Sequence, residues 1–498
     1  MSTAVVIPVA EAPEPRFDFP TWLPPMFVKE LRQGLRTRGF VGSMVGFQVV
    51  MVVAFVWAFA VNIFGESDAQ GTVNGFFWGV LGIMLLVITP LRAMAGLRQE
   101  IDAKTLDLLM LTNLTSWRIV LGKWTSLLAQ SALLVLALLP YGLVRYFFGS
   151  VDLLQDLIGI ASMYLGCGML TAVALWVSGL PRLLRIGLPI GLVLMAQGMG
   201  GFIFGGMAHG GMRITPSSGS GGAVAWLMVF DCVLLLLFCL VQAVRRIAPP
   251  AENHSPLARG LALLTLAAVP VLYIFDGKET AMGQLWIAVV ALALVTIIEI
   301  SSLRRPMSVH VRTWWRRGRM GGWVGRLVLP GWPSAALFTA FWLAVAAVGA
   351  SMELIKLSSA SPGDMAWLFA LLWAALVFPM VLLSFAPNIG RQAPLVYFIL
   401  QAAFGILSLF IGNTSSIRMS ETVKAIEWLA HLLPVSSFWL QLEPLATHPA
   451  YDGRYFTGQA VMLVVVAALA VWRGWGYWSW VHAQGASLRQ EKKAVPAG

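Results

Sequence analysis

Residues able to do chemistry are sparse in this sequence and form no familiar catalytic pattern. Six histidines are scattered through or near expected loops, without an H-E-x-x-H motif or acids paired at useful spacing. A phosphate-binding G-x-x-x-x-G-K-[ST] loop is also missing, because Trp124 follows Gly122-Lys123 and Trp117 takes the place of the first glycine. We therefore expect no catalytic residue, metal ligand or bound cofactor on this chain.

Asp231 is the main ionisable residue within an apolar segment, in the stretch MVFDCVLLLLF. A carboxylate near the middle of a membrane span costs about 2.5–3.5 kcal/mol on insertion scales, so it should face a polar partner or a polar pathway. Three interpretations stay open: a role in transport, a helix-packing contact with an amide such as that of Gln130, or a position nearer the outer interface.

The composition indicates what class of protein carries these residues. Hydrophobic residues make up 58% of the chain and charged residues 11%, which is typical of an integral membrane protein rather than of a soluble one. The net charge of +11 fits cytoplasmic loops rich in Lys and Arg, so we do not expect nucleic acid as a partner.

Apolar stretches of about 20 residues, enough to cross about 30 Å of hydrocarbon, predict an all-α polytopic membrane protein with about twelve transmembrane helices. The stretches are 41–64, 75–95, 125–145, 157–180, 184–206, 223–246, 260–275, 283–303, 334–352, 365–386, 394–413 and 459–481. Basic residues gather in alternate loops, including 96–124 and 304–333, whereas the intervening loops carry mainly acids. This asymmetry places both termini in the cytoplasm and the protein in the inner, or cell, membrane.

Two polar segments flank the first spans. PPMFVKELRQGLRTRG opens with Pro24-Pro25 and closes at Gly39, which predicts a short amphipathic helix on the inner membrane surface. EIDAKTLDLLMLTNLTSWRIVLGK, residues 100–123, predicts a surface helix followed by a second helix that starts at Thr115 or Ser116 and enters the third span. A simple chain reversal needs only a handful of residues, so this loop presents a surface to a partner.

The pattern E-x-x-x-x-T-L-x-L-L-x-x-T followed by S-W-x-I-V-x-G-K resembles the loop between the second and third helices of ABC-2 type transporter permeases. The resemblance implies an N-terminal amphipathic elbow helix and a cytoplasmic coupling helix that docks on a separate ATPase. Asn113 departs from it, standing where the family commonly has proline. The residues that would dock on the ATPase are Glu100, Thr105, Leu108, Leu109, Thr112, Trp117 and Arg118, and the matching residues also include Leu106, Ile119, Val120, Gly122 and Lys123.

The resemblance implies a function as well. The chain would be the membrane permease subunit of an ATP-binding cassette transporter that exports an unidentified substrate. ATP would be bound and hydrolysed by a cytoplasmic ABC ATPase subunit, so this chain would not itself be an enzyme. Its other partners would be membrane lipid and a second permease unit. That unit would come from another copy of the chain, from a different permease, or from the second half of this one.

We expect five segments along the chain. A flexible tail covers 1–23, a permease-like domain 24–247, two further helices with a basic loop 248–333, a diverged second permease-like unit 334–482, and a cytoplasmic tail 483–498. In the fourth segment, AIEWLAHLLPVSSFWLQLEPL predicts two short helices broken at Pro434, similar to the outer re-entrant hairpin of the same family.

Two other functions remain as alternatives. An ion-coupled secondary transporter would carry ionisable residues deep in its helices, where this chain has few apart from Asp231. A lipid-modifying membrane enzyme would need a catalytic constellation that the sequence does not display.

Overall fold

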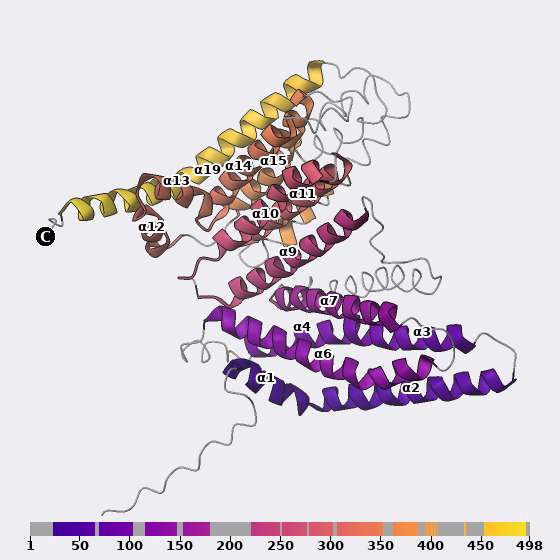
Figure 1. Ribbon diagram of the computed structural model, residues 1–498. Coiled ribbons are helices and arrows are strands. Elements are labelled where there is room, and N and C mark those ends of the chain that lie inside the picture. Colours follow the sequence, from indigo (N-terminus) through magenta and orange to yellow (C-terminus); the bar gives the residue numbers. More distant parts are fainter. Residues whose placement is uncertain are drawn as a thin grey trace, which may run out of the picture. The chain divides into compact units, whose positions relative to one another are not determined.

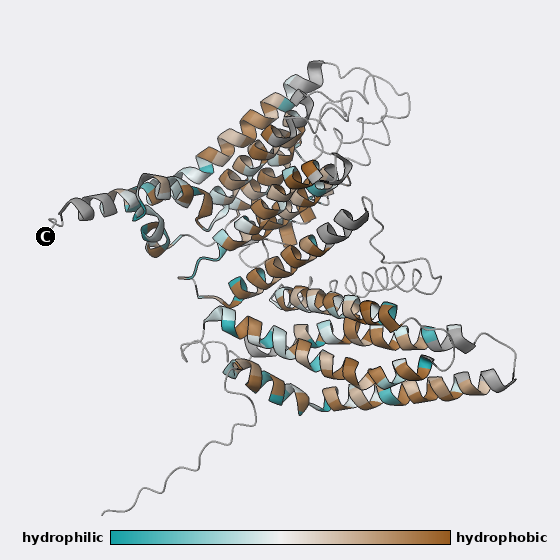
Figure 2. Cartoon of the chain, in the orientation of Figure 1, coloured by the Kyte–Doolittle hydropathy of each residue, from teal (hydrophilic) through white to brown (hydrophobic). Residues whose placement is uncertain are grey.

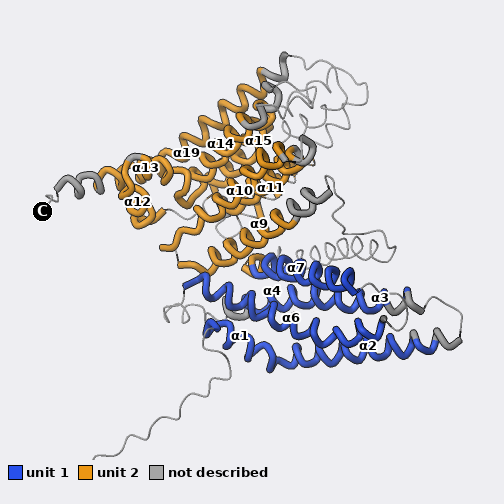
Figure 3. Tube along the Cα trace, in the orientation of Figure 1, with its two compact units in different colours: residues 1–175, 192–212 blue, residues 176–191, 213–498 orange. Residues whose placement is uncertain are grey.

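The computed structural model describes residues 23–64, 69–102, 115–146, 153–179, 221–249, 251–275, 278–301, 306–351, 362–386 and 453–494, with scattered positions in 393–406 and at 433–434. Every element in this described part is a helix, which agrees with the predicted all-α class. The chain divides into two compact units, of which unit 1 comprises 1–175 and 192–212 and unit 2 comprises 176–191 and 213–498 (Figure 3).

Unit 1 begins with a short amphipathic helix and continues into long apolar ones. The helices are α1 (Pro25–Leu35), α2 (Arg38–Phe64), α3 (Ala69–Gly82), α4 (Thr89–Asp102), α6 (Ser116–Tyr146) and α7 (Leu153–Ser178). Figure 1 shows α2, α3, α4 and α6 running along one another. Helix α1 starts where Pro24-Pro25 predicted it, because proline at the first turn needs no intrahelical partner for its nitrogen.

A π-helical turn, η1 (Ile83–Ile88), joins α3 to α4 without a break in the helix. The side chain of Thr89 donates a hydrogen bond to the carbonyl of Met84 at 3.0 Å, and the backbone N–H of Thr89 reaches the same carbonyl. Wide turns of this kind are rare and occur mostly as single insertions within α-helices. The second predicted span is therefore one long helix that contains an insertion near its middle.

Unit 2 contains the remaining described helices. They are α9 (Gly221–Ile247), α10 (Ser255–Phe275), α11 (Lys278–Ser301), α12 (Ser308–Trp315), α13 (Gly318–Val328), α14 (Trp332–Ser351), α15 (Pro362–Ser384) and α19 (Gly453–Ala494). Its largest apolar cluster joins α10, α11, α14 and α15, with Trp342 fully buried in it. The indole of Trp342 donates a hydrogen bond to the carbonyl of Ala262 at 2.9 Å, which fixes α14 against α10.

Two glycines shape the predicted basic loop of 304–333. Gly318, the first residue of α13, has φ +88°, and Gly331, between α13 and α14, has φ +121°. Residues with a Cβ rarely adopt these angles, so glycine is what allows the chain to turn here. Helices α13 and α14 meet at a bend of 105°, and the loop is thus folded into two short helices.

Seven described helices are long and apolar enough to cross a membrane, or eight if the bent α13–α14 pair counts as one more. Figure 2 shows that apolar residues predominate along these long helices. The predicted spans 223–246 and 283–303 overlap α9 and α11, which are not among these seven, and Gly283–Glu299 of α11 is a shorter apolar stretch. The predicted span 184–206, nearly all of the hairpin around Pro434 and most of 394–413 lie outside the described residues, so the count of about twelve stays a prediction.

The grouping into units differs from the expected segments at one place. Helix α9 falls in unit 2, whereas the sequence placed it in the first permease-like domain, 24–247.

The predicted orientation can be tested at the two ends of the α6–α7 hairpin. Arg118 is exposed in the first turn of α6, and Leu153, at the start of α7, is 70% exposed. In intact cells, an impermeant thiol reagent should label Leu153→Cys but not Arg118→Cys, and permeabilised cells should label both. The unsubstituted chain controls for labelling of its own cysteines. Labelling of Arg118→Cys alone in intact cells would mean that the orientation is inverted.

Candidate functional site

The described part of the predicted coupling segment is the start of α6. This helix begins at Ser116, as predicted, with Trp117 half-buried and Arg118 exposed in its first turn. Glu100 lies in α4 at a point where only the backbone is described. The predicted docking residues Thr105, Leu108, Leu109 and Thr112 lie outside the described residues.

Helix α1 packs against Gly122-Lys123, the G-K dipeptide that ends the motif. A Cβ on Gly122 would lie 2.9 Å from Cγ of Met26 and 3.4 Å from the backbone nitrogen of Phe27, so only glycine lets α1 come this close. One residue later, Nζ of Lys123 lies 3.6 Å from Oε2 of Glu30, and both side chains are largely buried. Helix α1 is therefore fixed to α6 by close packing and by an ion pair.

A second contact ties α4 into the same end of unit 1. Nη2 of Arg92 donates a hydrogen bond to Oε1 of Gln130 on α6 at 2.8 Å. The guanidinium of Arg92 also lies 5.4 Å from the ring centroid of Phe40, at the start of α2. A Cβ on Gly34 of α1 would collide with the amide of Gln130. Four helices thus meet around the two polar groups of Arg92 and Gln130.

The opposite end of α6 has its own polar cluster. Arg145 donates hydrogen bonds to Asn74 Oδ1 at 2.9 Å and to Asp156 Oδ2 at 3.0 Å, with its guanidinium 4.4 Å from the ring centroid of Phe77. At 1.5 Å per residue, Lys123 and Arg145 are about 33 Å apart along α6, close to the thickness of the hydrocarbon layer of about 30 Å. The spacing of these two buried clusters matches the thickness of such a layer.

In unit 2, a buried carboxylate joins three consecutive helices. Oε1 of Glu299 on α11 lies 2.7 Å from Nη1 of Arg245 on α9, and Oε2 lies 3.3 Å from Nη2 of Arg259 on α10. Glu299 has no exposed side-chain surface, and the side chain of Arg259 is 2% exposed. We call these residues the Arg245–Glu299–Arg259 network.

The network continues to the bend between α13 and α14. Nη1 of Arg259 donates to the carbonyl of Leu327 and to Ser334 Oγ, the latter at 2.8 Å. Ser334 in turn donates to the carbonyl of Arg326 at 2.7 Å, and the hydroxyl of Tyr477 on α19 donates to the carbonyl of Pro330 at 3.0 Å. One buried arginine therefore connects the ends of α9 and α11 to the chain that turns into α14.

Asp231 contacts an amide, though not the one suggested from the sequence. Its Oδ1 accepts a hydrogen bond from Nε2 of Gln284 on α11 at 3.0 Å, and that nitrogen also lies 3.3 Å from the carbonyl of Thr265. Oδ2 of Asp231 is buried and has no hydrogen-bond partner among the described residues. Gln130 belongs to unit 1 and is used by Arg92, so it is not the partner.

Sequence reasoning missed Glu299 although it lies within a predicted span. The signal was present: a lone acid in the apolar run TIIEIS, with Arg245 and Arg259 near the same end of the two preceding spans. Because charged residues within spans pair with one another, this arrangement predicts an ion pair.

No group of His, Cys, Asp and Glu suited to a metal ion occurs in the described part of the chain. Comparison of the chain with protein-family models, with curated proteins and with solved structures gave no match.

The close packing of α1 on Gly122 predicts that a larger side chain at this position is destabilising. Valine there should push Met26 and the α1 backbone away, with a loss of about 1–3 kcal/mol of stability from overpacking. Gly46→Val on α2 is the matched control, because a Cβ there meets no atom within 4 Å. The midpoint of thermal denaturation of the detergent-solubilised protein should fall for Gly122→Val and stay near the wild-type value for Gly46→Val. Equal midpoints for the two variants would contradict the close packing.

The buried network predicts a large cost for neutralising its acid. Glu299→Gln leaves Arg245 and Arg259 without their counter-charge, which for buried pairs costs about 3–5 kcal/mol. Glu252→Gln removes a partly exposed carboxylate that pairs with His254 and should cost less than about 1 kcal/mol. Expression level and thermal midpoint should therefore drop for Glu299→Gln alone. A Glu299→Gln protein as stable as the Glu252→Gln protein would show that the network does not hold the helices together.

Proposed function

We propose that this protein is the membrane permease subunit of an ATP-driven exporter of the ABC-2 kind and works with a separate ATPase subunit. The observation that carries the proposal is the packing of α1 on Gly122 and Lys123, residues of the motif by which the chain resembles that family. In such a permease α1 is the elbow helix, and the segment that contains Leu108 and Leu109 is the coupling helix.

The contacts around α6 suggest how an ATPase would act on the membrane helices. The docking segment connects α4 to α6 along the chain. A hydrogen bond from Arg92 to Gln130 also joins these two helices directly. Helix α1 is held on α6 by the Lys123–Glu30 ion pair. A displacement of the docking segment would therefore move α1, α4 and α6 as one packed group, rather than one helix at a time.

The absence of a P-loop from this sequence supports a partner that supplies ATP hydrolysis. The direction of transport follows from the resemblance, and the substrate is unidentified. A second permease unit would complete the pathway.

An ion-coupled secondary transporter is the second candidate, and one observation favours it. The half-buried Asp231 offers one carboxylate oxygen to Gln284 and keeps the other without a hydrogen-bond partner in the described part of the chain. An acid placed in this way within a span suits proton or cation binding. The two functions differ in their need for an ATPase, and that need decides between them.

The test is a charge introduced at the docking surface. Leu108→Asp with Leu109→Asp would place two unpaired charges in the contact, at a cost of several kcal/mol, which weakens association by orders of magnitude. The wild-type chain should co-purify with a protein that carries a G-x-x-x-x-G-K-[ST] loop and hydrolyses ATP. The double aspartate variant should insert normally and lose that partner.

Leu108→Met with Leu109→Met is the matched control, because it keeps an apolar surface of similar size and should keep the ATPase. If the aspartate variant retains the ATPase at wild-type stoichiometry, the segment is not the docking site. If the wild-type chain yields no ATP-hydrolysing partner, the ion-coupled function is favoured instead.

A further inference from the structure

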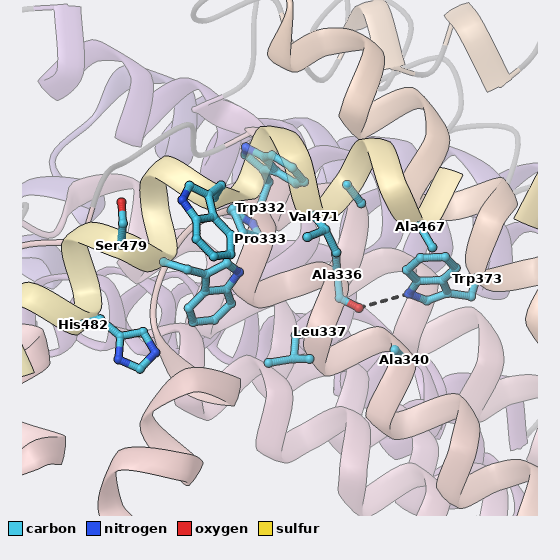
Figure 4. A pocket seen from close by; sticks show the side chains of 13 residues that line it. Trp332, Pro333, Ala336, Leu337, Ala340, Trp373, Ala467, Val471, Ser479 and His482 are labelled. Carbon is cyan, nitrogen blue, oxygen red and sulfur yellow. Dashed lines mark hydrogen bonds between the residues drawn. The ribbon is translucent and has the colours of Figure 1, made fainter. Parts of the chain in front are cut away.

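An apolar groove runs along unit 2 between α14 and α19, with α15 behind it. Its volume is about 710 Å³, within the range of about 300–1,000 Å³ found for ligand pockets. Alanines on the two facing helices create the space, namely Ala336 and Ala340 on α14 and Ala467 and Ala470 on α19. Figure 4 shows Trp373 of α15 beside Ala467, at the end of the groove away from His482, where its indole donates to the carbonyl of Ala336 at 3.1 Å.

The groove has the length of one membrane leaflet. From Ala467 to His482 it follows α19 for about 22 Å at 1.5 Å per residue, about half the full thickness of a bilayer with its headgroups. Tryptophans line the half of the groove nearer His482, namely Trp475 and Trp478 of α19 and Trp332 of α14. Tryptophan is enriched at the level of the lipid headgroups, so the His482 end lies at the membrane surface.

The polar end of the groove carries a basic pair. Nη2 of Arg326 on α13 lies 3.0 Å from Nε2 of His482, and its guanidinium lies 4.6 Å from the ring centroid of Trp323. A guanidinium only donates hydrogen bonds, so His482 accepts through Nε2 and keeps its other ring nitrogen for a further partner. In the part of the chain that the structure describes, no carboxylate pairs with Arg326 or with His482.

We propose that this groove binds one anionic phospholipid from the leaflet next to α12 and α13. An acyl chain lies along the alanines between α14 and α19, and the phosphate accepts hydrogen bonds from Arg326 and His482. Three observations select this occupant: an apolar groove, a length of one leaflet, and two basic groups without a described acid at the surface end. The proposal does not depend on the export function or on the identity of the ATPase.

The experiment uses the full-length chain in mild detergent with equal amounts of phosphatidylglycerol and phosphatidylcholine that carry the same acyl chains. Native mass spectrometry counts the retained lipids. The wild-type protein should retain phosphatidylglycerol in preference, because a charge-assisted hydrogen bond adds to the apolar contact. Arg326→Ala with His482→Ala should lower retained phosphatidylglycerol about tenfold, to the level of phosphatidylcholine.

Two further variants distinguish the contribution of the lipid headgroup from that of the acyl chain. Arg316→Ala removes an exposed arginine at the end of α12, outside the residues that line the groove, and should leave the lipid preference unchanged. Ala340→Leu with Ala470→Leu fills the groove with apolar atoms and should lower the retention of both lipids.

Three results would overturn the proposal. They are equal retention of the two lipids by the wild-type protein, an unchanged preference in the Arg326→Ala, His482→Ala protein, and undiminished retention in the groove-filling protein. The Ala340→Leu, Ala470→Leu protein keeps Arg326 and His482 and adds only apolar atoms. It therefore tests the proposal even if the Arg326→Ala, His482→Ala protein fails to fold.

Discussion

A polar group inside hydrocarbon must find its partner within the protein, and that constraint decides where helices meet in both units. In unit 1, the indole of Trp124 on α6 donates to the carbonyl of Gly168 on α7 at 3.0 Å, and the hydroxyl of Tyr164 returns a bond from α7 to Leu128 at 2.8 Å. In unit 2, Trp342 makes the equivalent bond from α14 to α10. Apolar packing alone distinguishes poorly between a neighbouring helix and lipid, so these directed bonds select the neighbour.

Charged groups inside hydrocarbon also need partners within the protein, and leaving them unpaired costs more free energy. In each unit the charged groups are paired near helix ends. Lys123 and Glu30 do so at one end of α6, and Arg145 with Asp156 at the other. The Arg245–Glu299–Arg259 network is more deeply enclosed, because the side chains of Arg259 and Glu299 are 2% and 0% exposed. Arg259 also donates hydrogen bonds to a backbone carbonyl and a hydroxyl at the turn into α14. Replacing a whole buried network by apolar residues often changes stability little, whereas removing one member leaves the others unpaired at a large cost. The network therefore favours the helix arrangement that pairs all of its charges.

The sequence predicted the elements better than their contacts. Pro24-Pro25 predicted the start of α1, and Thr115-Ser116 predicted the start of α6, because both are local capping signals. The partner of Asp231 was missed since Gln284 and Gln130 are equally good amides in sequence, and only the fold places the amide of Gln284 within hydrogen-bond distance of Asp231. Gly122 and Lys123 were recognised as part of a motif, whereas their contact with α1 depends on how α1 folds back onto α6, which the motif does not show. The groove was invisible for a similar reason: its alanines look like ordinary close-packing residues until α14 and α19 are placed together.

The π-helical turn η1 explains how one long helix keeps a single buried side. Phe77 and Leu81 are buried upstream of it, and Ala93 and Leu97 are buried downstream. Ala93 lies sixteen residues after Phe77, and Leu97 lies sixteen residues after Leu81. In an uninterrupted α-helix, at about 100° per residue, each pair would point about 160° apart. One extra residue in the wide turn reduces that angle to about 60°, so that the downstream half, including Arg92, turns back toward α6. The insertion thus acts as a register correction, and a chain shortened by one residue between Ile83 and Ile88 would present Arg92 to lipid.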